Sequence, residues 1–353
     1  MLQPKHLGGA VTAQPVMEKQ DDPILLVEHL TKRYAARHDL LGRVRSRVSA
    51  VDDVSFSMRR GETLAIVGES GSGKSTLAKL VVRLTAPTSG RMVFEGIDIG
   101  TARGTASRDL HRKIQIVFQD PYSSLDPRQV VGRIIAEGLH YSGLDRAARK
   151  RRVLECMESV GLPAAMVSNF PHQLSGGQRQ RVGIARMLAA DADLIVADEP
   201  VSALDGSIQG QVLNLLRKLQ SERGLTMLFI THDLSVARYM ADRIAVMHLG
   251  RIVEFAPTER LFEQPVHPYT QALLSAVPRF GRGDGKRIIL AGEAPSPIDP
   301  PPVCRFAGRC RWRTDACVNG DPALSEDVGP DHSVACFNWR TIPADSIGRQ
   351  AAG

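Results

Sequence analysis

The chain has 353 residues, of which 43% are hydrophobic and 24% charged, and its formal net charge at pH 7 is +7. This composition is typical of a globular chain with one large or two modest domains. No apolar run approaches the roughly 18 to 20 residues of a membrane-spanning helix, and the first 22 residues are too polar for a secretory signal, so we expect neither. The positive charge suits nucleic acid, anionic lipid or nucleotide phosphates and does not choose among them.

The first half of the chain predicts a sheet domain interrupted by helices. Residues 1–22 are polar and irregular, so we expect a disordered N-terminus. Apolar segments at 24–27, 54–58 and 63–67 predict strands, and the last is apolar throughout, as in a strand buried on both faces of a parallel sheet. Apolar residues then recur at helical spacing from Leu77 to Leu84.

The second half of the chain continues this pattern and then changes character. Helical patterns dominate from about 121 to 179, and apolar strands resume at 194–197 and 227–230 with a helical pattern between them. The order strand, helix, strand predicts the α/β class with a mostly parallel sheet. Beyond residue 262 prolines become frequent, which predicts a loop-rich C-terminal extension. The predicted organisation is therefore a disordered terminus at 1–22, a sheet domain at 23–262 with a helical subdomain inserted at about 121–179, an extension at 263–341 and a flexible tail at 342–353.

A phosphate-binding loop lies between the strand at 63–67 and the helix after it. Residues 68–75 read Gly-Glu-Ser-Gly-Ser-Gly-Lys-Ser, which fits the pattern G-x-x-x-x-G-K-S. Its glycines let backbone N–H groups surround phosphates at the positive end of the helix dipole. We expect Lys74 to reach the β- and γ-phosphates of ATP and the Ser75 hydroxyl to bind Mg²⁺. A glycine turn with an incidental lysine is the weaker alternative in this strand-to-helix setting.

Polar side chains also follow the two later strands directly. Asp198 and Glu199 are adjacent carboxylates at a strand end, where burial requires a cation or a catalytic role. We expect Asp198 in the Mg²⁺ shell and Glu199 as the base that orients the attacking water, with solvated carboxylates as the alternative. His232 follows the next strand and is expected at the γ-phosphate, although a lone histidine is more often a packing or capping residue. Because the carboxyl ends of parallel strands form the ligand crevice, Lys74, Glu199 and His232 should converge.

Residues 174–178 read Leu-Ser-Gly-Gly-Gln and resemble the signature of ATP-binding-cassette (ABC) proteins, which many phosphate-loop enzymes lack. The resemblance runs from about residue 24 to about 340. It implies a phosphate-loop, RecA-like α/β core with a mostly parallel sheet, an antiparallel β subdomain, an inserted α-helical subdomain and the C-terminal extension. It also implies that two cassettes pack head to tail, so that the signature of one closes over ATP held by the phosphate loop of the other.

The resemblance adds site residues to those expected from the strand ends. Gln119 matches the glutamine loop that joins the sheet to the helical subdomain, and Tyr34 matches the aromatic that stacks on adenine, with an ordinary core aromatic as the alternative. The expected catalytic residues are Lys74, Gln119, Glu199 and His232, and the expected Mg²⁺ ligands are Ser75, Gln119 and Asp198. The residues expected to contact ATP are Tyr34, Gly68, Ser70, Gly71, Ser72, Gly73, Lys74, Ser75, Thr76, Ser175, Gly176, Gly177, Gln178 and Asp205.

Three further segments resemble the oligopeptide and dipeptide importer branch, which also includes nickel importers: residues 117–127, residues 207–216 and the proline-rich stretch from residue 293. This implies an Mg-dependent ATP hydrolase, peripheral on the cytoplasmic face of the inner membrane. Its implied partners are a second identical or homologous cassette, two transmembrane permease subunits and, indirectly, an extracytoplasmic solute-binding protein.

Other functions stay open as alternatives. An importer of nickel or another small solute would carry the same ATP site. A soluble nucleic-acid-handling cassette protein is less favoured, because the chain has neither a second cassette nor a long heptad insertion, and we expect no nucleic-acid partner. A non-catalytic regulatory module would be expected to lack Lys74, Glu199 or His232, and all three are present.

Four cysteines lie in the extension: Cys304, Cys310, Cys317 and Cys336. Their spacing does not match the C-x-x-C pairs of common zinc sites, and the expected reducing compartment disfavours disulfides. Four thiolates could hold a [4Fe–4S] cluster. Zinc binding and packing as small buried hydrophobic residues are the alternatives.

Overall fold

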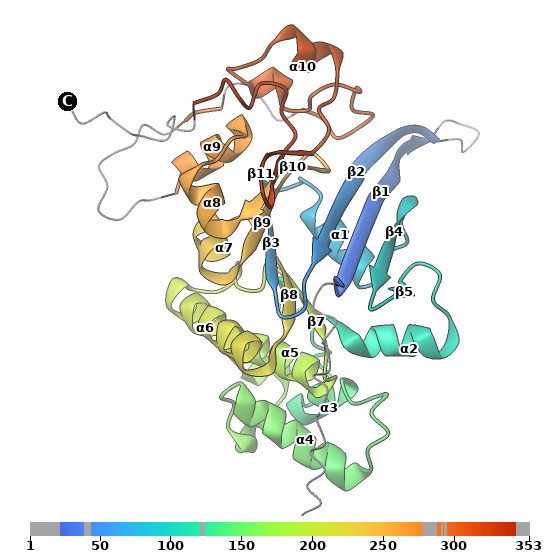
Figure 1. Ribbon diagram of the computed structural model, residues 1–353. Helices are drawn as coiled ribbons and strands as arrows, with labels where there is room; N and C mark the ends of the chain where they lie inside the picture. Colours follow the sequence, from blue (N-terminus) through green and yellow to red (C-terminus); the bar gives the residue numbers. More distant parts are fainter. Residues whose placement is uncertain are drawn as a thin grey trace, which may run out of the picture.

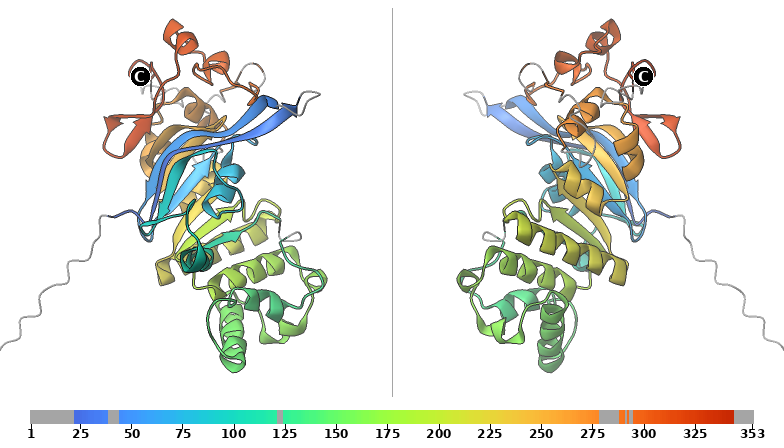
Figure 2. Two further views of the ribbon diagram at one scale, coloured as in Figure 1. Left: turned by 90° about the vertical axis from the view of Figure 1, so that its right-hand side faces the viewer. Right: turned by 90° about the vertical axis from the view of Figure 1, so that its left-hand side faces the viewer.

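A computed structural model describes residues 22–38, 44–120, 124–277, 288–290, 292 and 295–343. Two sheets form the middle of the molecule, the helical subdomain forms one end and the C-terminal extension forms the opposite end (Figures 1 and 2). The expectations for the first 21 residues and for the tail from residue 344 fall outside the described residues. Among those described, no helix is both long enough and apolar enough to cross a membrane.

The larger sheet carries the phosphate loop. Its strand order is β11-β12-β10-β9-β3-β8-β7-β6, in which β6, β7, β8, β3 and β9 run parallel and the others antiparallel. The bounds are β3 (Thr63–Val67), β6 (Ile114–Val117), β7 (Leu194–Asp198), β8 (Thr226–Thr231), β9 (Arg243–His248), β10 (Arg251–Pro257), β11 (Ser325–Gly329) and β12 (His332–Val334). Every residue of β3, β7, β8 and β9 is buried, which explains their continuous apolar runs. The predicted strands at 63–67, 194–197 and 227–230 are confirmed.

The smaller sheet is the antiparallel subdomain, with strand order β2-β1-β4-β5. It comprises β1 (Leu25–His38), β2 (Val44–Met58), β4 (Ser89–Phe94) and β5 (Ile97–Asp98). The predicted strands at 24–27 and 54–58 belong to this sheet, where Leu25 pairs with both Met58 and Phe94. Leu77 and Leu80 fill the space between the two sheets, so one core joins them.

The helices are α1 (Lys74–Val81), α2 (Gly104–Lys113), α3 (Val131–Glu137), α4 (Arg146–Ser159), α5 (Gly176–Ala189), α6 (Gly206–Arg223), α7 (Leu234–Met240), α8 (Thr258–Glu263), α9 (Pro268–Ser275) and α10 (Asp315–Asn319), with 3₁₀ turns η1 (Ala164–Ser168), η2 (Pro171–Gln173) and η3 (Ala307–Arg309). The first helix is shorter than predicted, because the chain leaves it before Leu84, whose side chain is 60% exposed. Helices α3, α4 and α5 contact one another and share a core with β7 and β8.

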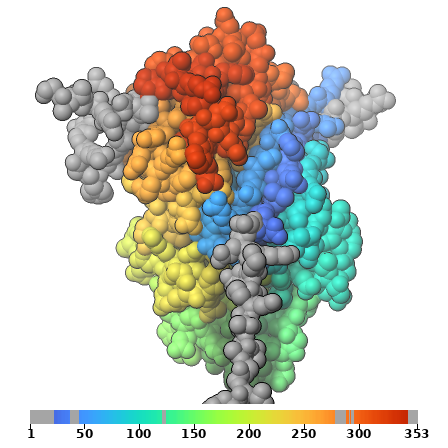
Figure 3. All heavy atoms as spheres, in the orientation of Figure 1, coloured from blue at the N-terminus to red at the C-terminus, as the bar shows by residue number. Residues whose placement is uncertain are grey.

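The extension is tied to the cassette by strands as well as loops. β12 pairs with β10, with Glu254 opposite Val334, and β11 pairs with β12. Phe306 is buried in a cluster with Tyr269 and residues of β9. The space-filling view shows the extension covering one end of the molecule (Figure 3). The sequence does not predict β11 and β12, because these short, mostly polar segments lack the alternation of a half-buried strand.

Candidate functional site

The phosphate loop joins β3 to α1, and its glycines are required by close backbone contacts. Gly68 has φ 158°, and a Cβ there would lie 2.1 Å from the carbonyl oxygen of Met247. Gly73 has φ 106°, and a Cβ there would lie 2.0 Å from the carbonyl oxygen of Ala50. Only glycine fits these positions, so the loop can lie in close contact with both β9 and β2.

Lys74 begins α1 and its side chain is turned back into the loop. Its ammonium donates to the carbonyl oxygens of Gly68 at 2.8 Å and Glu69 at 2.9 Å. Burial lowers the pKa of Lys74, while the negative charges of Glu199, Asp198 and Glu69 oppose that change. A buried ammonium at a helix N-terminus gives the loop the charge and the donors that phosphate groups need.

Ser75 and Asp198 place two oxygen atoms side by side at the loop. The Ser75 hydroxyl donates to Oδ1 of Asp198 at 3.1 Å. Burial raises the pKa of Asp198, an effect increased by Glu199 and opposed by Ser75 and two lysines, Lys79 and Lys74. A buried carboxylate beside a hydroxyl is the kind of oxygen donor set that fits Mg²⁺.

Two side chains from neighbouring strand ends lie against the carboxylate of Glu199. Nε2 of Gln119, after β6, lies 3.1 Å from Oε2 of Glu199, and Nδ1 of His232, after β8, lies 3.2 Å from the same oxygen. Glu199 has φ 48°, a strained value for a residue with a side chain, and its N–H donates to the carbonyl of Ile230 at 2.9 Å. The structure thus brings Gln119, Glu199 and His232 together, and the charge of Glu199 reaches Lys74.

The signature segment forms the start of α5. The Ser175 hydroxyl accepts from the N–H of Gln178 at 3.3 Å, and Oε1 of Gln178 accepts from the N–H of Ser175 at 2.9 Å, which is a capping box. A Cβ on Gly177 would lie 2.4 Å from Cγ2 of Ile208, so α5 and α6 pack closely here. Ser175 is exposed, and in the part of the chain that the structure describes no hydrogen bond joins residues 174–178 to residues 68–76.

The remaining expected ATP contacts lie in different settings. Tyr34 is 39% exposed on β1, with the ammonium of Lys32 4.9 Å from its ring centroid, so it is not a core aromatic. Ser70 is exposed on the loop, whereas Thr76 is half-buried in α1. Asp205 is exposed at the N-terminus of α6 and its side chain makes no capping bond there.

The four cysteines of the extension, here called the cysteine group, are free and lie near one another. Burial raises the pKa of Cys304 to about 11 and of Cys336 to about 12, and the neighbouring thiols add to both changes. Among the described residues no three His, Cys, Asp or Glu side chains are placed to hold a single metal ion. A four-iron cluster needs a wider arrangement, since each thiolate binds a different iron.

Three residues that the sequence did not single out also shape the site. Glu69 lies inside the phosphate loop, its N–H donates to the hydroxyl of Tyr269 at 3.0 Å, and its carboxylate pairs with Arg309. Tyr269 and Arg309 lie 200 and 240 residues from Glu69 along the chain. No local pattern could reveal such contacts, although a charged residue in a phosphate loop is a signal that a partner is needed.

Two family models match the chain: "ABC transporter" at residues 51–202 and "Oligopeptide/dipeptide transporter, C-terminal region" at residues 253–317. A "Putative peptide import ATP-binding protein" of Brucella ovis is 48% identical over 319 residues, covering 90% of this chain and 98% of the relative. The "Dipeptide transport ATP-binding protein DppF" of Escherichia coli is 47% identical over 317 residues, covering 89% of this chain and 94% of the relative.

Solved structures show the same fold. The dimeric ATP-binding cassette MJ0796, described as a post-hydrolysis state bound to ADP and Pi, has TM-score 0.59 and 31% identity, covering 66% of this chain and 98% of that one. The cbiO1 protein of Clostridium perfringens, part of an ABC transporter complex, has TM-score 0.58 and 30% identity, covering 69% of this chain and 91% of that one. The resemblance and the fold class inferred from the sequence are therefore confirmed. With its phosphate loop, its strand-end carboxylates and its signature helix in one fold, the chain belongs to the ABC transporter ATPases, as an ATP-binding subunit of the oligopeptide/dipeptide branch.

Proposed function

We propose that this chain hydrolyses ATP to drive import of dipeptides or oligopeptides, as one of two cassettes attached to a pair of membrane subunits. The similarity of nearly the whole chain, extension included, to peptide-import ATP-binding proteins carries the proposal. The chain then sits on the cytoplasmic face of the inner membrane, an extracytoplasmic binding protein delivers the peptide, and no nucleic acid takes part.

The phosphate loop binds the nucleotide in this proposal. Lys74 exchanges its bonds with the loop carbonyls for the β- and γ-phosphates, and the N–H groups at the start of α1 bind the same groups. Ser75, Asp198 and Gln119 would hold Mg²⁺, which supplies positive charge against the phosphate oxygens when bound. Tyr34 supports the adenine ring, because its exposed face on β1 leaves it available for stacking.

Glu199 acts as the base. Its carboxylate accepts a proton from the attacking water, while Gln119 donates to Oε2 of that carboxylate at 3.1 Å and Nδ1 of His232 lies 3.2 Å from the same oxygen. The strained backbone of Glu199 is held by the bond to Ile230, so the carboxylate is oriented before nucleotide arrives. His232, more than half exposed, can also donate to the γ-phosphate.

The second half of each ATP site comes from the other cassette. The exposed N-terminus of α5, with Ser175 as its cap, presents N–H groups to the γ-phosphate bound by the partner. Closure of the pair on ATP and reopening after hydrolysis move the helical subdomain, which follows Gln119 in the chain. That movement is transmitted to the membrane subunits.

The cysteine group holds a [4Fe–4S] cluster in this proposal. Burial raises the pKa of Cys304, Cys310 and Cys336, and the N–H groups of Phe306, Trp312 and Asn338 oppose that change by donating to the three sulfur atoms; binding of iron would supply the charge that the thiolates need. When bound, the cluster cross-links a segment that has little core of its own. This part of the proposal rests on the convergence of the four thiols.

Reconstitution tests the proposal. The chain is co-expressed with two hydrophobic permease subunits and a second cassette, and uptake by proteoliposomes is measured with ATP inside. Uptake of a labelled dipeptide that Lys74→Ala abolishes supports the proposal, with Lys218→Ala, at an exposed lysine of α6, as the control. ATP-driven uptake of nickel without peptide would favour the metal-importer alternative. Failure to assemble with membrane subunits, together with DNA-stimulated ATPase activity, would favour the nucleic-acid alternative.

A further inference from the structure

The extension contacts the phosphate loop directly at Glu69, the second residue of the loop. Nη1 and Nη2 of Arg309 donate to Oε2 and Oε1 of Glu69 at 3.0 and 3.4 Å. Two parallel N–H···O bonds fix the direction of a carboxylate as well as its distance. The Arg309 side chain is 11% exposed and that of Glu69 is 38% exposed, so the pair is partly buried and is screened less than a fully exposed ion pair.

The backbone of Glu69 is fixed at the same time. Its N–H donates to the hydroxyl of Tyr269 at 3.0 Å, and its carbonyl oxygen accepts from Lys74 at 2.9 Å. Tyr269 is fully buried in α9, with its ring centroid 4.4 Å from that of His248 and 5.5 Å from that of Phe306. The part of the loop that leads into the phosphate-binding turn is therefore supported by two parts of the extension, α9 and the segment that carries Arg309.

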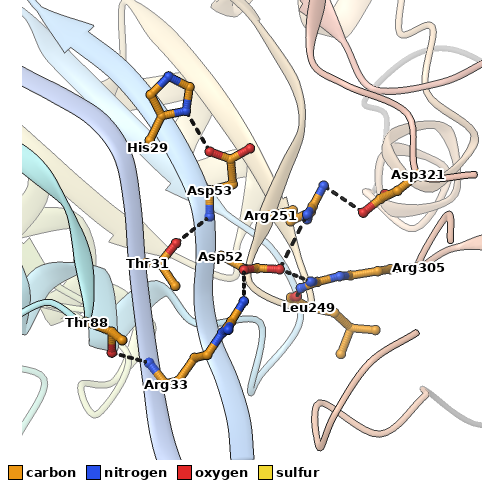
Figure 4. A network of polar contacts seen from close by, with 10 residues as sticks. All are labelled: His29, Thr31, Arg33, Asp52, Asp53, Thr88, Leu249, Arg251, Arg305 and Asp321. Carbon is orange, nitrogen blue, oxygen red and sulfur yellow. Dashed lines mark hydrogen bonds and ion pairs between the residues drawn. The ribbon is translucent and has the colours of Figure 1, made fainter. Parts of the chain in front are cut away.

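The segment that carries Arg309 is itself anchored to the cassette. Arg305, almost completely buried, donates to Asp52 on β2 and to the carbonyl of Leu249 (Figure 4). Gly250, which follows Leu249 in the turn between β9 and β10, donates its N–H to the carbonyl oxygen of Ser72 in the phosphate loop at 2.8 Å. The segment is thus linked to the loop a second time through the turn between β9 and β10, and its contacts with Leu249 and Asp52 fix the position from which Arg309 reaches Glu69.

A carboxylate inside a phosphate loop needs such a partner. The phosphates of ATP carry several negative charges, and in a partly buried site they repel a nearby carboxylate more strongly than they would in open water. Arg309 neutralises Glu69 and directs its carboxylate toward the extension. The nucleotide then meets the Lys74 ammonium and the loop N–H groups.

We infer that Arg309 is a positioning residue for ATP, acting through Glu69, and that the extension by this contact sets the nucleotide affinity of the cassette. The inference rests on the proposed role of residues 68–75 as the ATP site. It assigns to the C-terminal extension a part in nucleotide binding, although none of its residues needs to touch the nucleotide.

Titration of the full chain with a fluorescent ATP analogue and Mg²⁺ tests the inference. Arg309→Ala should weaken binding about fivefold, as expected for loss of one partly exposed ion pair, and Arg309→Lys should weaken it less. Adding Glu69→Gln to Arg309→Ala should restore the affinity of the parent chain, because the unpaired charge is then gone. Arg311→Ala is the matched control and should change nothing, since this exposed arginine stacks over Trp312.

Binding measured at several salt concentrations, together with steady-state kinetics, distinguishes a positioning role of Arg309 from a purely structural one. The penalty of Arg309→Ala should shrink as salt is raised, because repulsion between Glu69 and the phosphates is screened. In the assembled transporter KM for ATP should rise with kcat at saturating ATP unchanged. Unchanged affinity of Arg309→Ala, or a double variant as weak as the single one, overturns the inference. A parent chain that binds no nucleotide would instead refute the proposed ATP site.

Discussion

Among the described residues, two of the three buried histidines where the extension meets the cassette, His248 and His267, should make the protein sensitive to mild acid. His248, the last residue of β9, and His267, just before α9, are each 2% exposed. Their rings pack against Phe306 with centroids 5.6 and 5.7 Å apart. Nδ1 of His267 accepts from the N–H of Tyr269 at 3.1 Å, which an imidazolium cannot do, so the folded state holds this ring neutral.

The size of this loss of stability follows from the difference in proton binding between the folded and the unfolded chain. Burial lowers the pKa of His248 to about 4, with the charge of Glu69 opposing and that of Arg309 adding to the change, and lowers the pKa of His267 to about 3. The unfolded chain binds these protons near pH 6.5, whereas the folded chain does not bind them until pH 4 and pH 3. Stability is therefore fully present above about pH 6.5 and falls as the pH is lowered toward 4. At pH 5 each ring contributes a loss of about 2 kcal/mol, a large part of a typical stability of about 5 to 15 kcal/mol.

Urea denaturation at about pH 7.5 and pH 5 measures this loss. His248→Gln keeps a polar side chain of similar length but removes the titration, so its loss between the two pH values should be smaller than that of the parent by about 2 kcal/mol. His140→Gln, at an exposed histidine of the helical subdomain, is the control and should leave the parental difference. Equal pH dependence in the parent and in His248→Gln would refute the reasoning, because the protonation difference would then lie elsewhere.

Four other changes give separate tests. Glu199→Gln removes the base and keeps the shape, so ATP turnover in the complex should fall by roughly 10² to 10⁴ while nucleotide still binds, and a parental rate would rule out this base. Ser175→Arg should leave nucleotide affinity of the single chain unchanged and abolish ATP-driven dimerisation in light scattering; a large loss of monomer affinity would contradict the shared site. Gly177→Ala places a methyl group against Ile208 and should lower the free energy of unfolding by about 1 to 3 kcal/mol, measured by urea titration. Cys310→Ser should remove iron and sulfide from protein purified without oxygen and make the extension protease-sensitive; protein without iron in either form would favour simple packing.

The convergence of the strand-end side chains could be predicted from the sequence because it depends on local patterns. Lys74 is adjacent to a glycine-rich turn between a buried strand and a helix, and Glu199 and His232 each follow an apolar strand, so chain order alone brings them to one edge of a parallel sheet. The predicted strands and the family follow from the same short patterns. The head-to-tail use of Ser175, by contrast, remains a prediction, since it depends on a second chain.

The sequence by itself determined the α/β class, the phosphate loop and the order of the strand-end side chains, since each is encoded within a few neighbouring residues. Only the tertiary structure decided that Arg309 and Tyr269 support Glu69, and that β12 pairs with β10 to attach the extension to the sheet. Glu69 is 200 residues or more from Tyr269 and Arg309 along the chain, so these contacts depend on how whole elements pack. A single charge or buried hydroxyl forms no repeating sequence pattern from which its partner could be predicted. For that reason the residues at the strand ends could be placed from the sequence, whereas the contacts that hold the phosphate loop in position are seen only in the tertiary structure.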